Sequence, residues 1–112
     1  MHELGITRNL VAIVADAAGS RKVTRVNLDV GELSGVMADA IKFCFDVVAK
    51  DSPIDGALLA VRMVPGKGLC QECGAAVEMP SRITACSCGS RRIHVSQGED
   101  VKIASMELLE VA

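Results

Sequence analysis

The chain has 112 residues, a formal net charge of −2 and a hydrophobic share of 50%. This length allows one ordinary domain or a small domain with an insertion. The charge balance excludes the basic surface expected of a protein that binds nucleic acid, and only two aromatic residues, Phe43 and Phe45, are present to stack on bases. We find neither a membrane-spanning apolar run nor a signal-peptide layout and expect a cytoplasmic protein.

Hydrophobic periodicity predicts two helices and three strands in the order helix, strand, helix, strand, strand. Apolar residues recur at helical spacing over 3–18 and 36–49, and they alternate with polar residues or cluster as in strands over 23–33, 58–64 and 100–111. The last strand follows a cysteine-rich segment. We therefore predict an α+β fold with a small mixed sheet of about three strands and two helices. The cysteine segment is expected as an insertion, so that residues 1–66 and 96–112 form one domain and 67–95 a subdomain, with hinges near 65–68 and 96–98.

Four of the five cysteines are spaced like metal ligands: Cys70, Cys73, Cys86 and Cys88. Two pairs of thiolates on tight turns complete a tetrahedral zinc site, and a closed set of four protein ligands indicates a structural ion. Gly74 and Gly89 follow the two pairs and fit turns that require a positive φ. The alternatives are a disulfide, which a reducing compartment disfavours, unpaired thiols, a site in which His94 replaces one thiolate, or a rubredoxin-like iron site. The fifth, Cys44, is expected in the core.

The N-terminus offers a second set of metal ligands. The α-amine of Met1, the backbone nitrogen of His2 and its imidazole can close two adjacent chelate rings, a geometry that suits Ni²⁺ or Cu²⁺ better than Zn²⁺. Protons compete for the amine and the imidazole near neutral pH, so mild acid is expected to release the ion. The alternatives are a solvated terminal His2 and, for Glu3, a favourable charge at a helix N-terminus.

Three features together resemble the HypA/HybF family of hydrogenase maturation nickel metallochaperones. These are MHEL at the start, GELSG before the DAIKFCFD helix, and the cysteine pairs before a closing strand. The resemblance implies a nickel-binding α+β domain with an inserted zinc domain. It implies Ni²⁺ at Met1, His2 and Glu3 and Zn²⁺ at the four paired cysteines. It also implies work with the GTPase HypB on the large subunit of [NiFe]-hydrogenase, with urease served in some members.

The chain departs from the family pattern at its second cysteine pair. The family has Cys-x-x-Cys-Gly, whereas this chain has Ala85 where the first cysteine is expected and Cys86 one position late. This spacing puts the geometry and affinity of the zinc site in question. Asp39 and Glu32 are further candidates for support of the nickel site as outer ligands or hydrogen-bond partners. Their ordinary interpretation is a solvated helix face and a loop charge.

The sequence contains no convincing catalytic motif, and we predict that the protein is not an enzyme. The segment 31–35 places Ser one position too late for a nucleophile elbow, and 66–68 lacks the spacing of a phosphate-binding loop. The main alternative function is a zinc-ribbon module that binds nucleic acid or transcription machinery. Against it, we expect no nucleic-acid partner and no membrane; the sequence leaves monomer and homodimer open.

Overall fold

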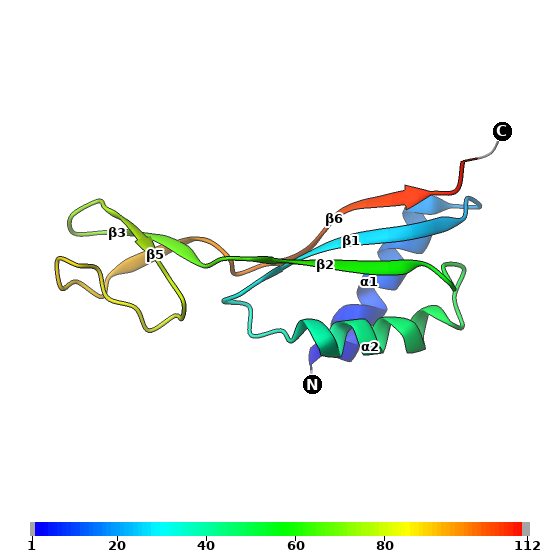
Figure 1. Cartoon of the computed structure of the whole chain (residues 1–112), viewed down its shortest axis with the longest axis horizontal. Helices are drawn as coiled ribbons and strands as arrows, with labels where there is room; N and C mark the ends of the chain where they lie inside the picture. Colours follow the sequence, from blue (N-terminus) through cyan, green and yellow to red (C-terminus); the bar gives the residue numbers. More distant parts are fainter. Residues whose placement is uncertain (1, 111–112) are drawn as a thin grey trace.

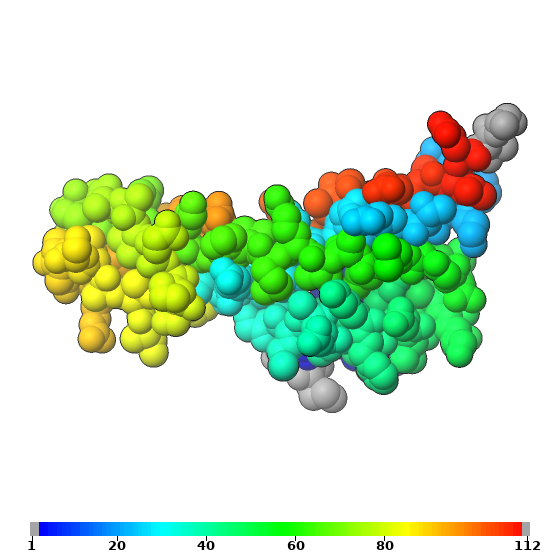
Figure 2. All heavy atoms as spheres, in the orientation of Figure 1, coloured from blue at the N-terminus to red at the C-terminus, as the bar shows by residue number. Residues whose placement is uncertain are grey.

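The computed structural model describes residues 2–110, except the side chain of residue 2. The chain forms two lobes joined by a narrow neck (Figures 1 and 2). Its radius of gyration is 17.3 Å, whereas a compact chain of this length has about 13 Å. We call residues 2–64 and 101–110 the body, residues 67–97 the cysteine lobe, and residues 65–66 and 98–100 the two connections.

The body contains two helices and one mixed sheet. The helices are α1 (His2–Ala18) and α2 (Ala38–Ala49), and the strands are β1 (Val23–Gly31), β2 (Leu58–Val64) and β6 (Val101–Leu108). The strand order is β2-β1-β6, with β2 parallel and β6 antiparallel to β1. Helix α2 provides the crossover that a parallel pair requires. This architecture confirms the predicted α+β class and the return of the last strand to the first sheet.

Both helices pack on one face of this sheet (Figure 1). The core is aliphatic except for Phe45, which is fully buried. Phe43, two residues earlier on α2, is 71% exposed, because positions two apart on a helix point in different directions. All fourteen buried members of the core cluster belong to the body: Leu10, Val11, Val14, Ala18, Val23, Val26, Leu28, Val30, Ile41, Phe45, Ala49, Ile54, Ala57 and Leu59.

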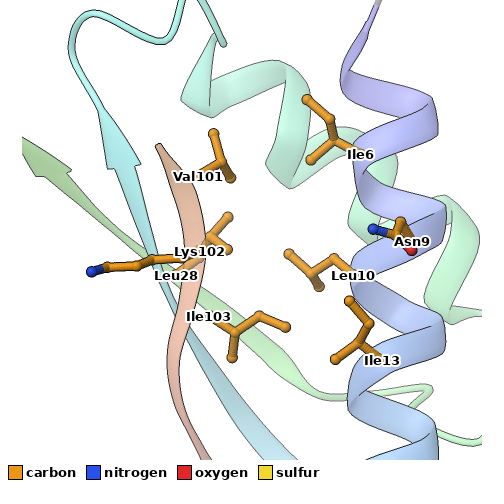
Figure 3. A pocket seen from close by; sticks show the side chains of 8 residues that line it. All are labelled: Ile6, Asn9, Leu10, Ile13, Leu28, Val101, Lys102 and Ile103. Carbon is orange, nitrogen blue, oxygen red and sulfur yellow. The ribbon is translucent and has the colours of Figure 1, made fainter. Parts of the chain in front are cut away.

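Strand β6 is covered only in part. A groove of about 270 Å³ separates α1 from this strand. Three apolar side chains of α1 face two of β6 across the groove (Figure 3): Ile6, Leu10 and Ile13 on the helix, and Val101 and Ile103 on the strand. Lys102, between the two strand residues, points to the opposite face of the sheet (Figure 3). Val101 and Ile103 are consequently only half-buried.

The cysteine lobe is a second antiparallel sheet. Its strands are β3 (Lys67–Cys70), β4 (Ala76–Glu78) and β5 (Ile93–Gln97), in the order β4-β3-β5. Within the described part of the chain, neither helix has the length and apolar character needed to cross a bilayer.

Candidate metal sites

The four paired cysteines converge at one end of the cysteine lobe. Cys70 ends β3 and Cys73 lies in the turn that follows, while Cys86 and Cys88 lie in the loop before β5. All four Sγ atoms are within 4.8 Å of one another, with 3.7 Å between Cys70 and Cys88 and 3.6 Å between Cys73 and Cys86. Sulfurs at about 2.3 Å from a tetrahedral zinc ion are about 3.8 Å apart. The donor set therefore fits zinc in both chemistry and spacing.

The two cysteine turns have the same hydrogen-bond plan at different lengths. The first spans residues 70–74, closed by Gly74 N–H donating to the Cys70 carbonyl at 2.9 Å; the second spans 86–89, closed by Gly89 N–H donating to the Cys86 carbonyl at 2.9 Å. Gly74 has φ 78° and Gly89 has φ 93°, as predicted for these positions. The shorter Cys86-Ser87-Cys88 pair is thus accommodated inside its turn, and both of its sulfurs still reach the cluster.

Within each pair, the two cysteines differ in burial and in proton affinity. Cys70 and Cys86 are buried, whereas Cys73 and Cys88 are exposed. Backbone N–H groups of Cys73 and Glu72 lower the pKa of Cys70 to about 6, and the backbone N–H of Cys88 lowers the pKa of Cys86.

The exposed partners bind their protons more tightly. The backbone N–H of Ser90 favours the Cys88 thiolate, but interactions with the Cys70 and Cys86 sulfurs outweigh it and raise the pKa of Cys88 to about 12. For Cys73, the backbone N–H of Ala75 is similarly outweighed by the Cys86 and Cys70 sulfurs, and its pKa is raised. A metal ion must displace these protons to complete the four-thiolate set, so binding is pH-dependent.

Of the predicted N-terminal ligands, the structure places Glu3; Met1 and the side chain of His2 lie outside the described residues. Glu3 is half-buried in the first turn of α1. Its Oε2 accepts a hydrogen bond from the backbone N–H of Met37 at 3.3 Å. Its own backbone N–H and that of Met37 lower the pKa of the Glu3 carboxyl. The carboxylate is therefore held at the start of α2 in its charged form.

The two supporting candidates lie at different places along the connection into α2. Asp39 is exposed in the first turn of α2, two residues after Met37. Glu32 is exposed where β1 ends, and its backbone N–H donates to the Val64 carbonyl at 2.8 Å. Among residues 3–110, only the four cysteines form a set of three or more potential ligands close enough to share one ion. The carboxylates of Glu3, Glu32 and Asp39 are thus not brought together.

The structure adds a groove beside Glu3 that we did not predict. An apolar groove of about 350 Å³ is lined by Glu3, Leu4, Ala40, Phe43, Cys44 and Val47. Cys44 is half-buried at this groove and lies outside the buried core cluster. The sequence did contain one sign of the groove: Phe43 is an apolar residue that does not share the helix face formed by Ile41 and Phe45.

His94 is exposed on β5, in the cysteine lobe.

Comparisons with known proteins agree along nearly the whole chain. The family model described as hydrogenase/urease nickel incorporation, metallochaperone, HypA, matches residues 1–108. Hydrogenase maturation factor HypA from Nostoc sp. is 45% identical over 111 residues, covering 99% of this chain and 98% of the relative. The Geobacter metallireducens factor of the same name is 38% identical, covering 96% and 99%. The solution structure of the Ni metallochaperone HypA from Helicobacter pylori has a TM-score of 0.70 at 22% identity, covering 97% of this chain and 98% of that one, and supports the same fold.

Proposed function

Since this chain belongs to the HypA family of non-catalytic nickel metallochaperones for hydrogenase maturation, we propose that its nickel site is the N-terminus itself. The α-amine of Met1, the backbone nitrogen and imidazole of His2, and Glu3 bind Ni²⁺ reversibly. The observation that carries this proposal is the Glu3 carboxylate in the first turn of α1, which is held in charged form by its own backbone N–H and by that of Met37.

The nitrogen donors account for the choice of ion and for its release. Amine, deprotonated amide and imidazole lie in one plane around the ion, a geometry that Ni²⁺ favours and Zn²⁺ does not require. Asp39, in the first turn of α2 beside Met37, supports the site as an outer hydrogen-bond partner. Glu32 is the weaker supporting candidate, because its backbone is held at the lobe junction rather than at the N-terminus.

The cysteine lobe holds Zn²⁺ through Cys70, Cys73, Cys86 and Cys88. Four thiolates leave no open coordination position, so the ion has a structural role. The lobe contributes no residue to the buried core cluster, and metal binding therefore supplies much of its folding free energy.

Nickel delivery involves partner proteins, one of which hydrolyses nucleotide. Nickel passes, with the GTPase HypB, to the precursor of the [NiFe]-hydrogenase large subunit, and urease maturation is a second destination. The partner provides nucleotide hydrolysis, because the chain has no phosphate-binding loop. We place this exchange in the cytoplasm.

Nickel titration tests the N-terminal site. Calorimetry on the zinc-loaded wild type, on His2→Ala and on a variant extended by one N-terminal residue should show stoichiometric binding in the wild type alone. The matched control is His94→Ala, which removes the other histidine of the chain and should bind nickel like the wild type. Stoichiometric binding that survives both the His2→Ala change and the extension would contradict the proposal.

A further inference from the structure

The two connections between the lobes pass each other in close contact with the end of β1. A Cβ atom on Gly31 would overlap the carbonyl oxygen of Gly98, and one on Gly98 would come within 2.7 Å of the Gly66 Cα. Real Cβ atoms essentially never approach other atoms this closely. Glycine is therefore required at Gly31 and Gly98 by close packing of one backbone on another, and not only by the freedom expected of a hinge.

Hydrogen bonds also hold the two connections against the end of β1. Three successive N–H groups at the end of β1 donate at 2.8 Å each: Gly31 to Asp100, Glu32 to Val64, and Leu33 to Gly98. The end of β1 and the turn after it are therefore bonded alternately to the second connection and to the end of β2. Gln97 Nε2, at the end of β5, also donates to the Pro65 carbonyl in the first connection at 3.0 Å.

Leu33 from the body and Met79 from the cysteine lobe pack against the same glycine. A Cβ atom on Gly66 would lie 2.6 Å from Leu33 Cγ and would overlap the Met79 carbonyl oxygen. Met79 N–H donates to the Gly66 carbonyl at 2.9 Å. Leu33 is 5% and Met79 3% exposed, yet neither belongs to the core cluster of the body. The Leu33 side chain and the Met79 backbone thus meet at Gly66, whereas the Met79 side chain lies beside Gly68 of β3, where an added Cβ atom would be 2.8 Å from its Sδ.

Short chain segments link this contact between Leu33, Gly66 and Met79 to each metal site. In one direction, Ser34 Oγ donates to the Gly31 carbonyl at 2.6 Å and accepts from Val36 N–H at 3.2 Å, and the next residue, Met37, donates to Glu3. In the other direction, Met79 begins the segment 79–85 that leads to Cys86. Arg82 in this segment pairs with Glu99 of the second connection at 2.7 Å.

We infer that the Leu33 side chain and the Met79 backbone, both packed against Gly66, form an interlobe brace. The brace holds the cysteine lobe in one orientation on the body and positions the turn that presents the Met37 N–H to Glu3. The brace is complete only when the cysteine lobe is folded around its metal, because Met79 is placed by that lobe. Both are positioning residues, since neither offers a ligand to either ion. The effect on nickel rests on the proposed N-terminal site, whereas the fixed orientation does not.

Backbone ¹⁵N relaxation of the zinc-loaded protein tests the orientation without nickel. We expect amides of β1 and β3 to share one rotational correlation time in the wild type. Leu33→Ala, and Gly66→Ala, whose added Cβ atom would overlap Leu33 and the Met79 carbonyl, should each give the cysteine lobe a shorter correlation time than the body. Leu69→Ala is the matched control, because Leu69 is on β3, 47% exposed and away from the junction. Independent tumbling in the wild type, or unchanged common tumbling in both variants, would overturn the brace.

Nickel affinity tests the positioning role in the same variants. Leu33→Ala should weaken nickel binding by roughly 2- to 30-fold, the range found for substitutions between coupled sites, and Leu33→Met should restore it. Chelating zinc from the wild type should weaken nickel binding similarly, with little further loss in Leu33→Ala. Unchanged nickel affinity in Leu33→Ala, with an intact N-terminal site by the His2→Ala test, would overturn the positioning role alone.

Discussion

The carboxylate of Glu3 accepts a hydrogen bond from the backbone N–H of Met37 at 3.3 Å. This contact joins the first turn of α1 to the start of α2, where the cap residue Met37 has no side-chain hydrogen bond to the helix. One carboxylate therefore links the first turn of α1 to the start of α2 and satisfies a donor at that second helix end.

Removing this carboxylate should weaken nickel binding. We expect Glu3→Ala to reduce affinity by at least about 10- to 100-fold, the loss found when a partner that only orients a ligand is removed, because Glu3 is itself a proposed ligand. Glu3→Gln should reduce affinity less, because the amide oxygen still accepts from Met37. Nickel titration of the wild type and the two variants measures these affinities. Asp16→Asn, an exposed carboxylate near the other end of α1, is the control. Wild-type affinity in Glu3→Ala would argue against any role of this side chain.

Mild acid should release nickel before the Glu3 carboxylate titrates. The reference pKa values are about 7.7 to 8.0 for the α-amine and about 6.5 for imidazole. The pKa of Glu3 is lowered from 4.5 by its own N–H and that of Met37, so Glu3 remains ionised throughout this range. Following the absorbance of the nickel complex from about pH 8 to 5 should show loss between about pH 8 and 6. Retention of nickel to about pH 4, well below both reference values, would indicate a different ligand set.

Zinc removal should unfold the cysteine lobe and leave the body folded. The body holds every member of the buried core cluster, whereas the cysteine lobe depends on the metal. Chelation should therefore retain the helical circular dichroism signal while Cys70 and Cys86, buried in the folded protein, become reactive to a thiol reagent. Cys70→Ser should reproduce this state without chelator. Loss of the helical signal in parallel with zinc would show that the lobes fold as one unit.

The Asp29–Arg62 pair on the outer face of the sheet should stabilise the body above acidic pH. Arg62 Nε and Nη2 donate to the two carboxylate oxygens of Asp29 at 3.0 and 2.9 Å, and Asp29 is 7% exposed. This pairing lowers the pKa of Asp29 from its usual 3.8. The contribution is complete above the unfolded pKa and is lost as the pH falls through the lower folded value.

Urea unfolding at several pH values measures this contribution. Asp29→Asn should lower the free energy of unfolding by about 1 kcal/mol at neutral pH, and the difference from the wild type should shrink below pH 3.8, the usual pKa of this carboxyl. Asp46→Asn, an exposed carboxylate on α2, serves as the control with no such trend. A difference that grows toward acid would mean that the folded state raises, rather than lowers, the pKa of Asp29.

Local patterns were sufficient for the two helices and three strands of the body and for the zinc ligands, but not for the three short strands of the cysteine lobe. Alternation over 23–31 and helical spacing over 38–49 report burial on one face, so β1 and α2 were predictable. Cysteine spacing is likewise a local property, and the four sulfurs do converge. Predicting the function also required the resemblance to the HypA/HybF family, because the chemistry of His2 permits a nickel site without showing that the protein uses it. Family membership then decided for the metallochaperone over the nucleic-acid-binding ribbon.

The sequence by itself determined the α+β class, the inserted cysteine segment and the four cysteines that converge in it. Only the tertiary structure decided that Glu3 meets Met37, that Cys44 lines a groove instead of the buried core, and that Gly66 at the neck is close-packed against Leu33 and the Met79 backbone. The physical reason is that these relationships join residues far apart in the sequence, such as Glu3 and Met37, which are 34 positions apart. Periodicity reports which side of an element is buried, but it carries no information on which distant backbone arrives there.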